Sequence, residues 1–229
     1  MSILQQLILI LALTGILAVF ETWRPIETKQ PWSERLGNLF FMFVYLIIGG
    51  AATIVLSNIL QIEPPLVRPR GVAESLFVIL AAIFVWDFLF YWYHRAEHRF
   101  IWLWIMHRFH HADEHLNASS AMRHVWLENP IQNILIGVTV AYLLQLDAVS
   151  IFLFGIITTI WLMFVHANWK LSLGFLTPAI GGPQVHRIHH SILNEHRGKN
   201  FAVYFPVIDK IFGTYYAPGP DEFPPTGTN

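Results

Sequence analysis

The residues of this chain that could do chemistry are its histidines. Twelve of the 229 residues are histidine, and most recur at spacings of three and four, which place side chains on one face of a helix. Eight of them form one HxxxH motif and two HxxHH motifs. These eight are His94, His98, His107, His110, His111, His186, His189 and His190.

Such a set of imidazoles is typical of a metal site. Eight neutral ligands are too many for one ion and suit two, and neighbours such as His110 and His111 differ by about 100° around a helix, so they can reach different ions. His166, at the end of an apolar run, would be a ninth ligand. The chain has no cysteine, which excludes disulfides, iron–sulfur clusters and haem–thiolate chemistry. The imidazole and carboxylate ligands that remain suit iron and zinc.

The elements that must position these histidines have the composition of membrane helices. Hydrophobic residues make up 55% of the chain and charged residues 13%, whereas an average soluble domain has about 25% charged residues. Five apolar runs stand out, and the first lacks the basic start and the cleavage site of a signal peptide. The runs are 3–20, 39–60, 75–93, 131–146 and 149–165.

We therefore predict an all-α integral membrane protein with about four to five transmembrane helices. It is expected to form a single domain over 1–229, with N-terminal spans over 1–74, a catalytic region over 75–216 and a tail over 217–229. A proline-rich segment at 61–71 breaks the chain between the second and third runs.

The order of the runs predicts where the histidines meet. If the basic loop after the first run is cytoplasmic, the third run brings His94 to the cytoplasm. The runs 131–146 and 149–165 are joined by a short turn at Asp147 and must form a hairpin, so His166 and the second HxxHH motif return to the same side. A cytoplasmic, histidine-rich helical cap that holds a dinuclear metal site is therefore expected. The net charge of −1 offers no basic field for nucleic acid.

The order HxxxH, HxxHH, HxxHH across membrane spans resembles the fatty acid hydroxylase superfamily, also called the sterol desaturase family. The flanking sequences are similar too, namely DFLFYWYHRAEH, LWIMHRFHHADEHLNASSAMRHVWLE, FVHANW, QVHRIHHS and KNFAVYFPVIDKIFGTYY, and the resemblance covers about residues 76–216. It implies a membrane-bound, O2-dependent, non-haem di-iron monooxygenase with two iron ions, for which zinc could substitute. The implied reaction is hydroxylation or desaturation of an unactivated C–H in a lipid such as a sterol, a fatty acyl lipid or an alkylglycerol.

Position by position, the resemblance puts metal ligands on the eight patterned histidines and on His166. Four further residues match polar positions of the family and could be additional ligands or neighbours of the site. They are His124, His196, Asn117 and Asn200. Asp87 lies on the same helical stripe as His94, where its carboxylate could orient an imidazole by accepting that ring's second N–H.

The electrons must come from another protein, because the chain has neither a haem-binding HPGG segment nor a GxGxxG dinucleotide motif. The resemblance implies a separate donor, either a ferredoxin-type or a cytochrome b5-type reductase system. The short chain is similar to bacterial members, which favours a bacterial inner membrane with the metal site facing the cytoplasm.

Two other functions stay open on the pattern alone. A zinc hydrolase would need an activated water beside a positioned acid or base, as in HExxH. No HExxH occurs, and Glu97 in HRAEH is expected to point away from the ligands. A non-catalytic metal-binding membrane protein would carry the same histidines. The aromatic stretch from Trp86 to Trp104 could line a tunnel for an apolar substrate or simply anchor the helices.

Overall fold

The computed structural model describes residues 3–61 and 70–228, so most of the predicted proline-rich break at 61–71 lies outside the described residues. Within the described part the regular secondary structure is helical, apart from one isolated bridge between Ser191 and Thr226. The prediction of an all-α fold is confirmed.

Long helices build the body of the molecule. The chain forms α1 (Ile3–Trp23), then α2 (Trp32–Val44), which continues through a π-helical turn, η1 (Tyr45–Gly49), into α3 (Gly50–Ile59). It continues as α4 (Val72–Arg99), α5 (Ile101–His111), the 3-10 turn η2 (Ala118–Met122), α6 (Glu128–Gln132), the π turn η3 (Asn133–Val138), α7 (Thr139–Leu143) and α8 (Ala148–His166). The short elements that follow are η4 (Gly174–Leu176), α9 (Pro183–His189), η5 (Asn194–His196) and α10 (Pro206–Ile211).

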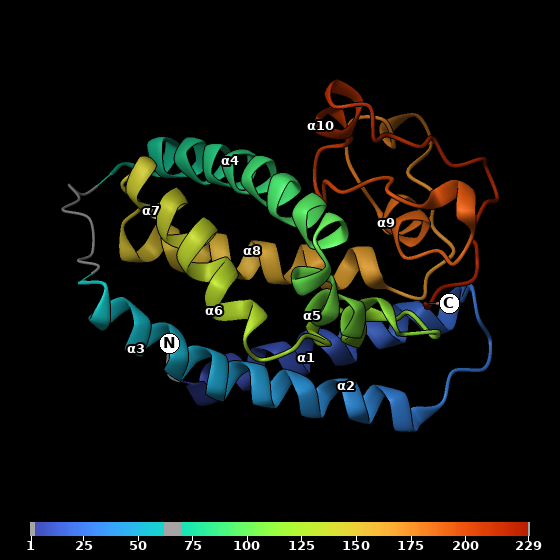
Figure 1. The fold of residues 1–229 in the computed structure, drawn as a ribbon, viewed down its shortest axis with the longest axis horizontal. Coiled ribbons are helices and arrows are strands. Elements are labelled where there is room, and N and C mark those ends of the chain that lie inside the picture. Colours follow the sequence, from blue (N-terminus) through green and yellow to red (C-terminus); the bar gives the residue numbers. More distant parts are fainter. Residues whose placement is uncertain (1–2, 62–69, 229) are drawn as a thin grey trace.

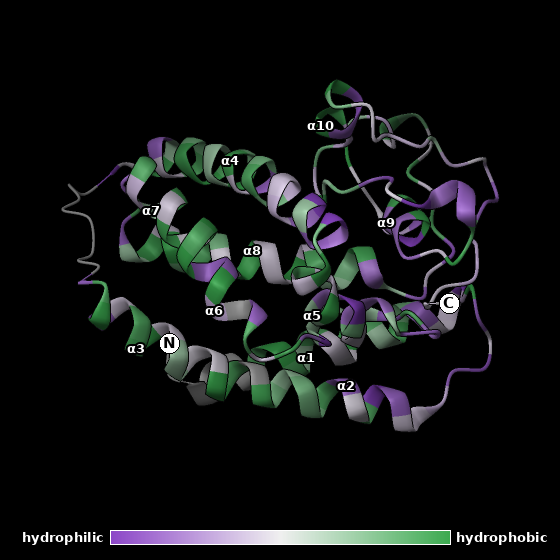
Figure 2. Cartoon of the chain, in the orientation of Figure 1, coloured by the Kyte–Doolittle hydropathy of each residue, from purple (hydrophilic) through white to green (hydrophobic). Residues whose placement is uncertain are grey.

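The body has the length and composition of a membrane domain. Three helical stretches are long and apolar enough to cross a bilayer, namely Trp32–Ile59, Val72–Arg99 and Ala148–His166. Two shorter apolar helices, Ile8–Trp23 and Pro130–Leu143, correspond to the first and fourth predicted runs. Figure 2 shows hydrophobic residues along most of these helices and hydrophilic ones gathered around α9, at one end.

The helices of the body pack around α4 and α8. Figure 1 shows α4, α8, α1 and the continuous stretch α2–α3 running along the long axis, with α9 and α10 at the end where α4 and α8 finish. Ile79 and Ala82 of α4, Val140 of α7 and Val165 of α8 belong to one buried apolar cluster. Inside a bilayer such contacts stabilise the helix bundle through van der Waals packing.

The end of α4 sets the geometry of the histidines. Phe100 is extended, with φ −104° and ψ 124°, and separates α4 from α5. The chain therefore turns directly after His98, and α5 packs back against the last turns of α4. This turn brings the HxxxH motif of one helix against the HxxHH motif of the next.

Candidate metal centre

Nine histidines come together where α4, α5, α8 and α9 meet, and they form two groups that could each hold a metal ion. Within each group the ligand atoms all lie within 4.8 Å of one another. The first group is His94, His98, His107, His111 and His189. The second is His110, His166, His186 and His190. These are the eight patterned histidines and His166, the ninth that the sequence indicated.

The rings of each group point their Nε2 atoms at one another. In the first group, Nε2 of His94 lies 3.1 Å from Nε2 of His107, and the same distance joins His111 and His189. In the second group, Nε2 of His166 lies 3.1 Å from that of His110 and 3.0 Å from that of His186. Two nitrogens bound at right angles to one ion, each about 2.1 Å from it, would lie about 3.0 Å apart.

Hydrogen bonds of the second ring nitrogen, Nδ1, determine which nitrogen of a ring carries no hydrogen, which we call bare. Nδ1 of His94, His166 and His189 lies 2.9, 2.7 and 2.9 Å from a backbone carbonyl oxygen. A carbonyl can only accept, so these Nδ1 atoms carry the hydrogen and each neutral ring presents a bare Nε2. In the His94–His107 pair, Glu128 accepts from Nδ1 of His107, so both Nε2 atoms are bare, and two such lone pairs 3.1 Å apart repel unless a cation lies between them. The donor set therefore fits metal ions.

Glu128 and Glu97 are the two residues near the centre that the sequence did not indicate as metal-site partners. An oxygen of Glu128 accepts from Nδ1 of His107 at 3.0 Å, and Glu97 lies 3.5 Å from the same nitrogen. Both carboxylates are buried. The expectation that Glu97 points away from the ligands is wrong, because His107 reaches α4 from α5. Glu128 follows His124 by four residues, a helical spacing that could have revealed it.

Burial favours neutral rings at five histidines of the centre. It lowers the pKa of four histidines outside the membrane spans well below the ordinary value, with neighbouring imidazoles adding to the effect. They are His110, His111, His186 and His190. Burial also lowers the pKa of His189, to about 3. Neutral imidazole is the form that binds metals.

The other candidate residues lie beside the two groups or away from them. His124 stacks on His110 at 4.3 Å between ring centroids, and its Nδ1 lies 3.1 Å from Glu128. It also forms a smaller cluster with His107 and Glu128 that could hold a metal. His196 instead pairs with Glu222 at 3.1 Å, outside these groups.

The candidate amides and Asp87 brace the backbone. Asn117 caps η2, and Asn200 donates to the carbonyl oxygens of Val185 and Tyr216. Asp87 does not face an imidazole. Its carboxylate accepts the backbone N–H groups of 203–205 at 2.7–3.1 Å, because the loop before α10 packs across α4 at that point.

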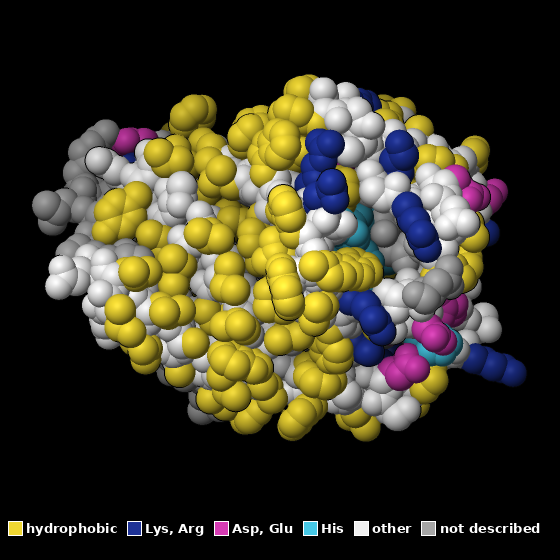
Figure 3. All heavy atoms as spheres, viewed as in Figure 1, with side chains coloured by type: hydrophobic (Ala, Val, Ile, Leu, Met, Phe, Trp, Pro, Cys, Tyr) yellow, Lys and Arg dark blue, Asp and Glu magenta, His cyan; other side chains and the backbone are white. Residues whose placement is uncertain are grey.

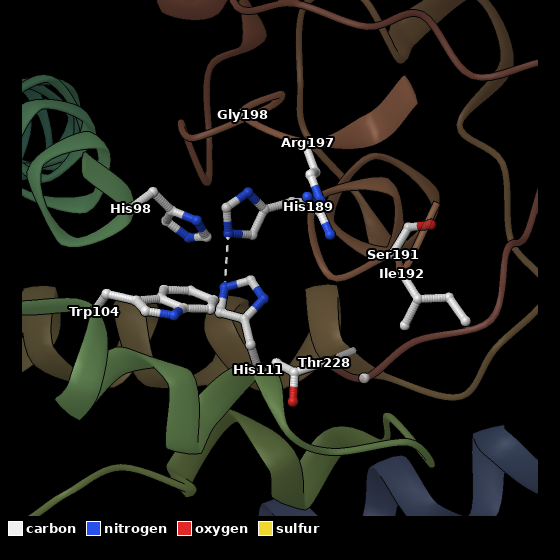
Figure 4. Close-up of a pocket in the computed structure, with 10 residues that line it drawn as sticks. His98, Trp104, His111, His189, Ser191, Ile192, Arg197, Gly198 and Thr228 are labelled. Carbon is white, nitrogen blue, oxygen red and sulfur yellow. Dashed lines mark hydrogen bonds between the residues drawn. The ribbon is translucent and has the colours of Figure 1, made fainter. Parts of the chain in front are cut away.

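Two cavities reach the histidines from different sides. One, of about 220 Å³, runs between the helices of the body and touches histidines of both groups; its lining includes Trp86, Phe90, Phe154 and Gly155. The other, of about 400 Å³, opens at the cap and is lined by His98, His111 and His189 together with Trp104 and Arg197 (Figure 4). Of the aromatic stretch from Trp86 to Trp104, Trp86 and Phe90 line the first cavity and Trp104 lines the second.

Comparison with known proteins agrees with this arrangement. The family model described as fatty acid hydroxylase matches residues 79–214. Alkylglycerol monooxygenase of Homo sapiens is 31% identical over 132 residues, which cover 57% of this chain and 29% of that protein. The Danio rerio protein of the same name is 30% identical over 140 residues, covering 59% of this chain and 30% of its own length.

A bacterial relative matches over more of the chain. Ornithine lipid hydroxylase OlsE of Rhizobium tropici is 23% identical over 231 residues, which cover 95% of this chain and 69% of that protein. The chain spans only about three tenths of the length of the alkylglycerol monooxygenases it matches. No solved structure gives a significant match. The family match covers more than half of the chain and contains all nine grouped histidines, so this chain belongs to the fatty acid hydroxylase family.

Proposed function

We propose that this chain is a membrane-bound, O2-dependent lipid hydroxylase whose nine grouped histidines hold two iron ions. The observation that carries the proposal is that histidine Nε2 atoms face one another at 3.0–3.1 Å in two adjacent groups, with both Nε2 atoms bare in the His94–His107 pair. The family and the relatives named monooxygenases and hydroxylases support oxygenation of a lipid.

The bound ions would supply reductive activation of O2 and removal of hydrogen from an unactivated C–H. The protein itself would hold the ions and exclude water from them. Backbone carbonyls lock the rings of His94, His166 and His189, and Glu128 locks His107. Such outer hydrogen bonds fix ring orientation and increase ligand basicity. The two groups contain no carboxylate, so no side chain within them is placed as a general base.

We propose that the substrate binds in the cavity between the helices. Its apolar lining by Trp86, Phe90 and Phe154 suits an alkyl chain, and its inner end is formed by histidines of both groups. A lipid that enters from the bilayer would bring a C–H bond to the metals while its own surface excludes water. A sterol, a fatty acyl lipid or an alkylglycerol would meet these requirements, and either hydroxylation or desaturation could follow.

Hydroxylation needs a reductant. One oxygen atom of O2 enters the C–H bond and the other leaves as water, which requires two electrons and two protons from outside. We propose a separate ferredoxin-type or cytochrome b5-type donor system. We also propose that the chain resides in a bacterial inner membrane with the histidine end facing the cytoplasm, where such donors are available.

The first experiment measures metal and oxygen together. The protein is purified in detergent under anaerobic, iron-replete conditions, and bound metal is quantified per chain. About two iron ions per chain are expected, one for each histidine group, with O2 consumption that depends on a reductant. Lipid analysis of a host with and without the gene should then reveal a lipid that gains one oxygen atom or loses two hydrogens.

A different result would contradict the proposal. Tight binding of zinc alone, with esterase or amidase turnover and no O2 consumption, would indicate a hydrolase. Metal binding without any turnover, and no change in the lipids of the host, would indicate a non-catalytic metal-binding protein.

A further inference from the structure

The cap-side cavity is the route from the polar end of the molecule to the candidate metal centre. Figure 4 shows His98, His111 and His189 pointing into it, with Trp104 on one side and Arg197 on the other. All three histidines belong to the first group, and the second group contributes none to this lining. The cavity proposed for the lipid, which we call the lipid cavity, lies instead between the helices of the body.

His98 is where the centre comes nearest to the surface. The other eight grouped histidines are all buried, whereas His98 is only half-buried. It also lines a second hollow beside the first, together with Arg99 and Gly198. A partner that covers these two hollows would lie directly over a ring of the first group.

Three exposed arginines lie on the segments that line these two hollows, and we refer to them as the arginine rim: Arg99, Arg108 and Arg197. Arg99 and Arg197 line the two hollows. Arg108 stands four residues after Trp104 and three before His111, a spacing that puts all three on one face of α5.

None of the three arginines of the rim has an acidic neighbour within the described part of the chain. Among the described residues, none of its members has a carboxylate oxygen within 4 Å, and neither hollow is lined by Asp or Glu. Arg35, Arg70 and Arg187, in contrast, pair with Glu21, Glu74 and Glu27. Figure 3 shows Lys and Arg side chains spaced around a hollow in which histidine is visible.

We propose that the arginine rim docks the acidic face of a soluble one-electron redox protein, which passes electrons to the metals through the edge of His98. The proposal rests on the proposed function, because a metal hydrolase would need no donor. Complementary charge accelerates the encounter of such partners and aligns them. The donor would use the cap-side opening while the lipid occupies the cavity between the helices, so the two do not compete.

The surface favours a protein over a lipid headgroup. Phosphate groups of the bilayer would also attract arginines at a membrane surface. They would not account for an opening that leads to three histidines of one group, nor for the position of Arg197 in the loop after η5, on the polar cap. Headgroup binding is a distinct outcome of the test.

The test uses a plant-type ferredoxin as the acidic probe. Full-length protein in phosphatidylcholine vesicles is compared with Arg99→Glu, Arg108→Glu and Arg197→Glu, singly and together. Arg24→Glu, in the loop after α1, is the matched control, since Arg24 is exposed and lies in neither hollow. Ferredoxin retention on the vesicles is measured with zinc-loaded protein, so docking is scored without any turnover. Reduction of iron-loaded protein is timed with pre-reduced ferredoxin and with a small neutral hydroquinone.

The triple variant should retain ferredoxin at least about tenfold more weakly at low salt, with a flatter salt dependence. Its reduction by ferredoxin should slow to a similar degree, while reduction by hydroquinone should stay within about twofold, since a neutral reductant needs no docking. The Arg24→Glu variant should behave as wild type.

Three results would overturn the proposal. Equal ferredoxin retention by the triple variant and wild type would show that the arginine rim is not the docking surface. Equal slowing with both reductants would place the effect in the metal site. Loss of binding to phosphatidylglycerol, with ferredoxin retention unchanged, would assign the arginines to headgroups. Ferredoxin docking on a protein that produces no oxidised lipid would leave the surface in place and contradict the proposed function instead.

Discussion

At the scale of single residues, the histidines differ in how firmly they are held. The Nδ1 atoms of His94, His166 and His189 bind carbonyl oxygens and that of His107 binds Glu128. The Nδ1 atoms of two others, His110 and His190, are buried without a hydrogen-bond partner among the described residues. The second group thus combines the fixed ring of His166 with two rings that only packing or a bound ion can orient.

Replacing Glu128 should weaken metal binding, although Glu128 belongs to neither of the two histidine groups. In Glu128→Gln, the amide loses the negative charge that orients His107 and His124, and metal affinity should fall about 10–100-fold. Titration against a competing chelator measures this. Glu222→Gln is the matched control, because Glu222 also accepts from a histidine, His196, outside the groups. Equal affinity in the two variants would contradict the role of Glu128.

His115 provides a test of pH dependence away from the metals. Its hydrogen bond with Glu27, at 2.8 Å, raises the pKa of the ring above the ordinary 6.5. The folded pKa is thus higher than the unfolded one, so this pair stabilises the protein below about pH 6.5 and the contribution disappears as the pH rises through the raised pKa. In NMR titrations the ring should show a pKa above 6.5 in wild type and a lower one in Glu27→Gln. An unchanged pKa would contradict the pairing.

Eight of the nine histidines were accessible to sequence reasoning because three short spacings specify helical faces, and His166 was indicated by its place at the end of an apolar run. The contacts of Glu97 and Glu128 with His107 were not accessible, because both carboxylates approach from other helices. For Asp87 the prediction from sequence was wrong. Its position on the same helical face as His94 predicted a contact with a histidine, yet the backbone of 203–205, more than a hundred residues away, occupies that face. Local periodicity finds which face a residue is on but not what packs there.

At the scale of elements, the break between α4 and α5 determines how the HxxxH motif and the first HxxHH motif meet in the candidate metal centre. The segment around Phe100 contains neither proline nor glycine, so no local signal marks the turn. The apolar runs predicted the long helices well, and α4 continues beyond its run to Arg99, carrying His94 and His98 with it. The π turns η1 and η3 likewise leave no clear pattern in the sequence.

A glycine of α8 should set how long an alkyl chain the lipid cavity accepts. Gly155 lines this cavity, and an added Cβ would meet no atom within 4 Å. In Gly155→Leu the side chain should shorten the cavity and shift the products to shorter chains. Stability should not fall, because Leu is better than Gly in a helix by about 0.8 kcal/mol.

Product chain lengths, measured by mass spectrometry, check this prediction. Gly15→Leu in α1 is the control, since Gly15 also has open space around it but is not part of the cavity lining. The same product distribution in both variants would mean that the alkyl chain lies elsewhere.

At the scale of the whole molecule, the metals would join parts of the chain that are distant in sequence. The first group takes His189 from α9, and the second takes His110 from α5. Each group therefore links the first half of the chain to the second. Bound ions would stabilise the folded protein over an unfolded chain in which these ligands are apart.

Removal of metal should consequently lower the stability of the whole protein. Chelator-treated protein should melt at a lower temperature, and readdition of metal at about 100 times its Kd should restore roughly 2.7 kcal/mol of stability. Thermal unfolding in detergent, followed by tryptophan fluorescence, measures the shift. Zinc should restore stability without O2 consumption. A melting temperature indifferent to metal would show that the groups bind no ion.

The turn at Phe100 and the late position of α9 also fix an order of events during synthesis. Five of the nine histidines are made with α4 and α5, but neither group is complete until α9 has been made and has folded back. The emerging chain thus displays imidazoles for some time without a finished site. Under the proposed function, each ion could reach its full set of ligands only after the last helices are in place, so a cell would have to deliver metal to the folded membrane domain and not to a nascent chain.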